Sequence, residues 1–86
     1  MIESAARDAA SAPLVRSLRD WRAERLLTIR DLARAAGVAP STVYLTETRQ
    51  TTPRPTVMRR IASVLGVDGH HVAEFRRAIE AYGRPR

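Results

Sequence analysis

Two short helical segments, expected at residues 29–36 and 40–47, lie on either side of Gly37. Thr28 and Asp31 are spaced as a capping box, in which each side chain bonds the backbone N–H of the other residue, and this predicts the start of the first helix. Gly37 ends that helix, because glycine takes the left-handed conformation at little steric cost. Each segment is too short to be stable alone, so both must be held by packing against neighbouring helices.

Apolar residues recur at helical spacing through most of the chain, and no segment shows the alternation of a strand. Pro13, Pro40 and Pro55 each stand where the first turn of a helix tolerates proline. We therefore predict an all-α fold, a compact five-helix domain over residues 13–82, with a flexible or frayed segment before it and a short basic tail after it. The predicted helices span residues 13–26, 29–36, 40–47, 55–65 and 69–82, the leading segment residues 1–12 and the tail residues 83–86.

A chain of 86 residues is long enough for one modest hydrophobic core and excludes a second domain. It has no cysteine, which excludes disulfides, thiolate zinc sites and a cysteine nucleophile. No apolar run could span a membrane and no signal-peptide layout is present, so we expect a soluble cytoplasmic protein. We find no Ser-His-acid set, carboxylate cluster or glycine-rich phosphate loop, and therefore expect no enzyme and no cofactor. Neighbouring residues on a helix point about 100° apart, so the adjacent His70 and His71 predict no metal site.

All 15 basic side chains are arginine, and with the 9 acidic ones they give a net charge of +6. The absence of lysine has a simple explanation in a GC-rich genome, since arginine but not lysine has GC-rich codons. The excess of positive charge nevertheless points to an anionic partner, of which nucleic acid is the commonest for a small basic domain.

The connection between the two short helices is three residues long, residues 37–39, which is the geometry of a helix-turn-helix. Ala33 is small where the two helices approach each other, and Leu32 and Val43 are apolar where the angle between them is set. In this motif the second helix enters the DNA major groove. That helix has a weak start here, because Ala39 stands where a Ser or Thr side chain would accept a backbone hydrogen bond, a deficit of about 1 kcal/mol.

Four stretches between Leu18 and Val67 follow a known pattern without a gap. They are Leu18, Arg19, Asp20, Trp21 and Arg22; residues 27–38; Ser41, Thr42, Val43 and Glu47; and Pro53, Ile61, Ala62, Leu65, Gly66 and Val67. In these residues the chain resembles the Cro and lambda-repressor type of helix-turn-helix domain, the XRE family. The resemblance implies a bacterial or phage transcriptional regulator that binds double-stranded DNA as a homodimer and is associated with the nucleoid.

The resemblance places base reading on the exposed face of the helix 40–47. Ser41 and Tyr44 can hydrogen-bond base edges, while Pro40 and Leu45 can make only apolar contact, for which a thymine methyl is the natural target. No arginine is among them, so we expect limited discrimination by direct hydrogen bonds and some dependence on DNA shape. The residues expected to contact phosphates flank that face, and they are Arg30, Thr42, Thr48, Arg49, Gln50, Thr51, Thr52 and Arg54.

Arg22 and Glu47 acquire a specific role from the resemblance. In the family the matching arginine and glutamate commonly form a partly buried ion pair, which joins the first helix to the end of the recognition helix. Without the resemblance, two solvated charges would be the simpler interpretation. We therefore predict a structural ion pair between these two side chains.

Several residues depart from the family pattern. Ile29 stands where a glutamine often bonds a phosphate, and Leu45 where a polar residue often reads a base. Thr46 replaces a buried apolar residue, so either its hydroxyl bonds back to its own helix or the local core is thinned. Thr48 and Arg49 replace a common glycine or asparagine. These departures keep a second hypothesis open, a protein-interaction module on the same fold, such as an antitoxin or a regulator-binding partner, with the docking patch Pro40, Tyr44 and Leu45.

The last predicted helix carries an apolar stripe formed by Phe75, Ile79 and Tyr82. A protein with one recognition helix commonly dimerises to span two half-sites, so the stripe is a candidate dimer face. Packing back onto the first helix and its Trp21 is the equal alternative. The arginines of this helix, Arg76 and Arg77, are expected on the solvated surface.

Overall fold

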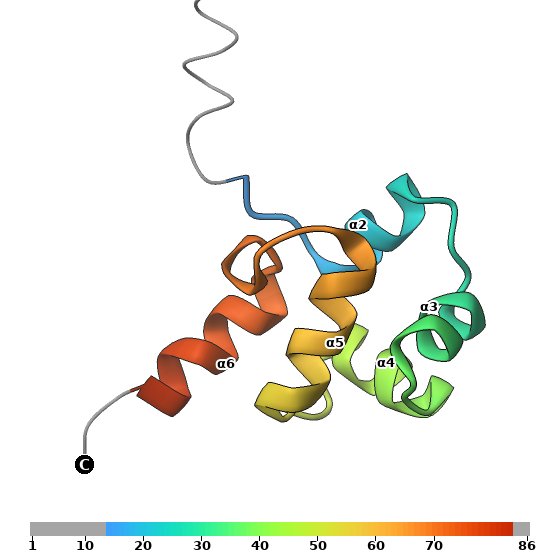
Figure 1. The fold of residues 1–86 in the computed structure, drawn as a ribbon. Coiled ribbons are helices and arrows are strands. Elements are labelled where there is room, and N and C mark those ends of the chain that lie inside the picture. The colour runs from blue at the N-terminus through green and yellow to red at the C-terminus, as the bar shows by residue number, and fades with distance from the viewer. Residues whose placement is uncertain (1–13, 84–86) are drawn as a thin grey trace, which may run out of the picture.

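The computed structural model describes residues 14–83, which form five α-helices, labelled as in Figure 1, and one short 3-10 turn. These residues contain no β-strand, so the predicted all-α fold is confirmed. None of these helices is long and apolar enough to cross a membrane. The predicted leading segment, the helix start at Pro13 and tail residues 84–86 lie outside the described residues. The helices are α2 Leu18–Glu24, α3 Ile29–Ala36, α4 Pro40–Glu47, α5 Pro55–Leu65 and α6 Ala73–Gly83, and the 3-10 turn η1 is Gly69–His71.

Helix α2 begins later than predicted, because the chain before it pairs with a distant segment. Ser17 is the N-cap of α2 and accepts a backbone hydrogen bond through its side chain. The N–H of Arg16 donates to the carbonyl of His71 at 2.9 Å, and the carbonyl of Arg16 accepts from the N–H of Ala73 at 2.8 Å. The prediction of a helix over residues 14–17 is therefore wrong, since this backbone finds its partners across the domain.

The predicted helix 69–82 is broken at Val72, and the same pairing is the cause. Val72 is extended, with φ −101° and ψ 119°, because the residues on either side of it bond the backbone of Arg16. Before the break, the side chain of Asp68 caps η1 by accepting from the N–H of His70 at 3.0 Å. Helix α6 follows the break as a separate element.

The caps at both ends of α3 form as predicted. Thr28 Oγ1 accepts from the N–H of Asp31 at 3.0 Å, and the carboxylate of Asp31 accepts from the N–H of Thr28 at 3.1 Å. Gly37 takes the left-handed conformation, with φ 71°. Ala39 gives α4 no side-chain cap, also as predicted. Leu26 has φ 59°, and this reversal lies just beyond the end of α2, which stops before its predicted boundary.

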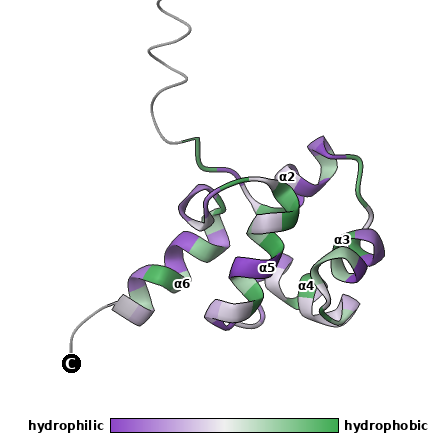
Figure 2. Cartoon of the chain, in the orientation of Figure 1, coloured by the Kyte–Doolittle hydropathy of each residue, from purple (hydrophilic) through white to green (hydrophobic). Residues whose placement is uncertain are grey.

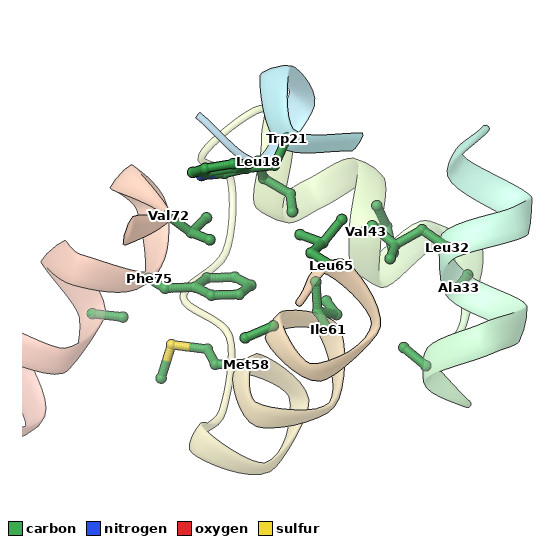
Figure 3. Close-up of a cluster of buried hydrophobic side chains, with 13 residues drawn as sticks. Leu18, Trp21, Leu32, Ala33, Val43, Met58, Ile61, Leu65, Val72 and Phe75 are labelled. Atoms are coloured by element: carbon green, nitrogen blue, oxygen red, sulfur yellow. The ribbon is translucent and has the colours of Figure 1, made fainter. Parts of the chain in front are cut away.

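Side chains from all five described helices meet in one hydrophobic core (Figure 3). Helices α3 and α6 are amphipathic, and hydrophilic and hydrophobic stretches alternate along their ribbons in Figure 2. The core packs α3 against both α4 and α5, and so fixes the pair α3 and α4 on the rest of the domain. It consists of Leu18, Trp21, Leu32, Ala33, Ala36, Val43, Met58, Ile61, Ala62, Leu65, Val72, Phe75 and Ala78.

Helix α6 packs back onto the domain through Phe75, which is fully buried in the same core as Trp21. Beside it Glu74 is buried, and Glu74 Oε1 accepts the N–H of the first residue of α2 at 2.8 Å. Phe75 therefore packs inward, as the second alternative predicts. The prediction that this residue belongs to a dimer face is wrong. Ile79 is half-buried against the core, and Tyr82 is exposed.

Candidate nucleic-acid interface

Helices α3 and α4 pack against each other across the turn at Gly37. Leu32 and Ala33 of α3 and Val43 of α4 are buried between the helices and the core, as their spacing predicts. The N–H of Val38 donates to the carbonyl of Ala33 at 2.9 Å, which closes the turn tightly after the glycine. The arrangement is a helix-turn-helix with α4 as its second helix.

An ion pair joins the end of α4 to α2, as predicted for Arg22 and Glu47. Arg22 Nε donates to Glu47 Oε2 at 2.6 Å, and Arg22 Nη2 donates to Glu47 Oε1 at 3.1 Å, so the contact is bidentate. The two side chains are only 15% and 7% exposed. The hydrogen bond to Glu47 raises the pKa of Arg22 against the opposing effect of burial. Arg22 Nη1 also donates to the carbonyl of Leu27 at 2.9 Å, so the same side chain orders the segment before α3.

Thr46 lies at the buried position where the family usually has an apolar residue. Its Oγ1 donates to the carbonyl of Thr42 at 2.7 Å, one turn back in the same helix, and the side chain is fully buried. The first of the two expected alternatives is therefore confirmed. Within residues 14–83 no buried side-chain nitrogen or oxygen lacks a partner, so this threonine leaves no unpaired polar group in the core.

The outer face of α4 is open. Pro40 and Ser41 are exposed, Tyr44 is 51% exposed, and Leu45 is half-buried. The structure thus brings together the four residues predicted to read bases on the part of α4 that is not buried in the core. Hydroxyl groups for hydrogen bonding come from the serine and the tyrosine, and apolar surface from the other two.

The residues predicted to contact phosphates come from the start of α3, from α4 and from the segment that follows α4. Thr42 is half-buried, whereas the others are exposed. Thr48 Oγ1 donates to the carbonyl of Tyr44 at 2.9 Å, and Gln50 Nε2 donates to Thr48 Oγ1 at 2.8 Å, so these two side chains also order the end of α4. The exposed ones are Arg30, Thr48, Arg49, Gln50, Thr51, Thr52 and Arg54.

Arg49 ends α4 in the left-handed conformation, with φ 59°. The N–H of Arg49 donates to the carbonyl of Thr46, and the next N–H donates to the carbonyl of Leu45 at 2.9 Å, which is the hydrogen-bond pattern of a glycine-type helix end. A residue with a Cβ is strained in this conformation by roughly 1–2 kcal/mol. Strained backbone of this kind often marks a functional position, and here the side chain that follows α4 is an exposed arginine.

Ile29 opens α3 and is half-buried against the core. Its side chain therefore supports packing and offers no polar group at the position where the family often bonds a phosphate. Arg30, the next residue, is exposed and is the positively charged group in the first turn of α3. The departure at Ile29 changes which residue can serve a phosphate without changing the fold.

The adjacent histidines belong to η1, and the His70 side chain bonds its neighbour Asp68. His70 Nδ1 is 3.0 Å from Asp68 Oδ1, and the pKa of Asp68 is lowered, first by the backbone N–H of His70 and then by its ring. Among the described residues no three His, Asp or Glu side chains are grouped so that they could hold a metal ion.

Sequence reasoning missed the contribution of α6 to the segment that follows α4. Tyr82 Oη donates to the carbonyl of Pro53 at 3.2 Å, and Pro53 is buried. Helix α6 therefore holds the loop that carries Arg49 and Arg54. The two residues lie 29 positions apart, so no local pattern could signal this contact.

A family model for a helix-turn-helix domain matches residues 13–75 of the 86-residue chain. The match includes both helices of the motif, the turn between them and the start of α6. No curated protein and no solved structure is significantly similar to the chain. Because the family match covers most of the chain and agrees with the geometry around Gly37, the chain belongs to the helix-turn-helix domain family, whose fold is typical of DNA-binding regulators.

Proposed function

We propose that the protein is a small transcriptional regulator that binds double-stranded DNA with sequence preference and places α4 in the major groove. The observation that carries the proposal is the two-sided character of α4. One side is fixed by the buried Val43 and Thr46 and by the Glu47 ion pair, while the other side leaves Ser41 and Tyr44 open. A rigidly held helix with an open polar face is what base reading in a groove requires.

Base reading by this face is modest in strength. Ser41 and Tyr44 supply hydrogen bonds, and Pro40 and Leu45 supply apolar contact that suits a thymine methyl. The face has no arginine, which is the side chain of the commonest specific contact to guanine. Sequence preference therefore depends on few direct contacts and in part on the shape of the DNA.

Affinity comes from charge around the face. Arg30 at the start of α3 and Arg49 and Arg54 in the segment after α4 are exposed and precede and follow the recognition helix in the chain. Phosphate contacts of this kind fix the register of the protein on the duplex and make its affinity fall with salt. We propose that two copies bind two half-sites about 34 Å apart, as dimeric proteins of this architecture do.

The test is a selection of binding sites from random duplex DNA, followed by affinity measurements on the recovered motif. Tyr44→Ala should weaken binding to the motif and change the preferred base at the contacted position. Leu14→Ala is a matched control, because Leu14 has the same 51% exposure as Tyr44 and precedes α2, outside the helix-turn-helix.

The outcome also decides the second candidate function. Recovery of a motif that depends on Tyr44 but not on Leu14 supports the DNA-binding proposal. Failure to enrich any motif, together with weak binding to all duplexes, contradicts it and favours a protein-interaction module with Pro40, Tyr44 and Leu45 as the docking patch.

A further inference from the structure

A hollow of about 150 Å³ lies between α6 and the loop that follows α4. Arg49, Thr51 and Thr52 line it from the loop, and Glu74 and Arg77 line it from α6. The bond from Tyr82 to the carbonyl of Pro53 holds these two walls together. In Figure 1 the C-terminal end of α6, the start of α5 and helix α4 all lie along the lower edge of the domain.

Arg49 and Arg77 are available to a ligand at this hollow. Both are exposed, and among residues 14–83 neither forms an ion pair with a carboxylate. Arg76, the neighbour of Arg77 on α6, is also exposed but differs from it in two ways. It does not line the hollow, and its Nε lies 3.8 Å from Glu80 Oε2.

The hollow also contains one negative group, the buried carboxylate of Glu74. Glu74 Oε1 accepts the N–H of Leu18, so this carboxylate ties α6 to the start of α2. Together with the two guanidinium groups of Arg49 and Arg77, this carboxylate leaves the hollow with a net charge of +1. With the hydroxyls of Thr51 and Thr52 beside them, the mouth of the hollow offers the donors that a phosphate oxygen accepts from.

We infer that Arg77 binds a backbone phosphate of the DNA whose bases contact α4, and that α6 extends the interface beyond the helix-turn-helix. The inference rests on the DNA binding proposed above. Arg49 contacts the phosphate from the loop side and Arg77 from the α6 side, so the phosphate bridges the mouth of the hollow. Arg77, expected from the sequence to be a solvated surface charge, would then position the domain on the duplex.

The test compares two substitutions that remove the same charge from adjacent exposed positions, Arg77→Gln and Arg76→Gln. Affinity for a pool of random-sequence duplex DNA is measured over a series of salt concentrations. Loss of one phosphate contact should make the slope of log affinity against log salt shallower by about 0.9. We expect this change for Arg77→Gln, an unchanged slope for Arg76→Gln, and recovery of most of the slope in Arg77→Lys, which keeps the charge.

Each result has a separate meaning. If the wild type binds duplex with strong salt dependence but Arg77→Gln keeps the same slope, the inference fails and the proposed DNA binding stands. Equal losses in Arg76→Gln and Arg77→Gln also overturn the inference, because they show a general effect of net charge. If the wild type does not bind duplex DNA at any salt concentration, the proposed function and the inference fail together.

Discussion

Helices α3 and α4 are each eight residues long, but they differ in their caps and in how their polar and apolar residues are distributed. Helix α3 has a capping box at its start, a left-handed glycine at its end and a strongly amphipathic pattern. Helix α4 has no side-chain cap, ends at the strained Arg49, and shows almost no segregation of polar and apolar residues. Local sequence therefore specifies α3 well and α4 poorly.

The difference shows which of the two helices depends on tertiary contacts. Helix α4 is held by distant partners, namely the buried Val43 in the core and the Arg22 and Glu47 ion pair to α2. Its outer face carries the exposed Ser41 and Tyr44. Places where local signals fail while tertiary contacts compensate are the places where functional sites are expected.

The ion pair gives the largest expected effect. Glu47→Ala leaves Arg22 without its partner at a site where the two side chains are 15% and 7% exposed, and it should lower the free energy of unfolding by about 3 kcal/mol. Urea unfolding measures this, with Arg19→Ala at an exposed position of α2 as the control. A double-mutant cycle of Arg22→Ala and Glu47→Ala that shows no coupling would refute the role of the pair as the tether of α4.

The caps test the contrast between the two helices directly. Thr28→Ala removes the side-chain bond to Asp31 and should lower the free energy of unfolding by about 1 kcal/mol. Ala39→Ser supplies α4 with the cap that it lacks and should raise stability by about 0.5–1 kcal/mol. Thermal and urea unfolding of both variants are compared with the wild type. A destabilising Ala39→Ser would show that the start of α4 is constrained by something other than a missing cap.

Substitution of the strained Arg49 should have opposite effects on stability and on DNA binding. Arg49→Gly removes the left-handed strain at φ 59° and should raise the free energy of unfolding by about 1 kcal/mol, while it weakens duplex binding through loss of a phosphate contact. Leu26→Gly is the matched control, because Leu26 has the same φ of 59° and carries no charge. It should gain stability without losing affinity. If both variants bind duplex as the wild type does, Arg49 is not a phosphate contact.

The smallest effect concerns pH and the capping box of α3. The backbone N–H of Thr28, and then its hydroxyl, lower the pKa of Asp31 below its ordinary value of 3.8. A carboxyl whose pKa is lower in the folded state contributes stability above its unfolded value, and this contribution is lost as the pH falls through the folded value. Urea unfolding as the pH falls from about 6 to about 3 should therefore lose stability less steeply for Asp31→Asn than for the wild type. Identical slopes would contradict this assignment.

Elements with local signals could be predicted from the sequence, and elements set by long-range pairing could not. The capping box at Thr28, the turn at Gly37 and the missing cap at Ala39 follow from neighbouring residues. The late start of α2 and the break at Val72 result from one backbone pairing between segments far apart in the chain. Helical spacing alone gave both places a continuous helix, because each segment is compatible with one when considered by itself.

The candidate site also has one part that could be predicted from local sequence and one part that could not. The face formed by Pro40, Ser41, Tyr44 and Leu45 follows from the helical period once α4 is recognised as the second helix of the motif. The wall contributed by Arg77 could not be predicted, because it depends on how α6 packs against the loop after α4. Charge placement around a motif can be predicted locally only for residues next to that motif in the chain.

We propose that α4 is the surface through which this protein binds DNA. Its most direct test is an NMR titration of the backbone amides with a duplex that carries the selected motif. We expect the largest shift changes at Ser41 and Tyr44 on α4 and in the loop 48–54, and no change on the exposed side of α2. Saturable duplex binding whose shift changes leave α4 unaffected and centre on another surface would contradict it.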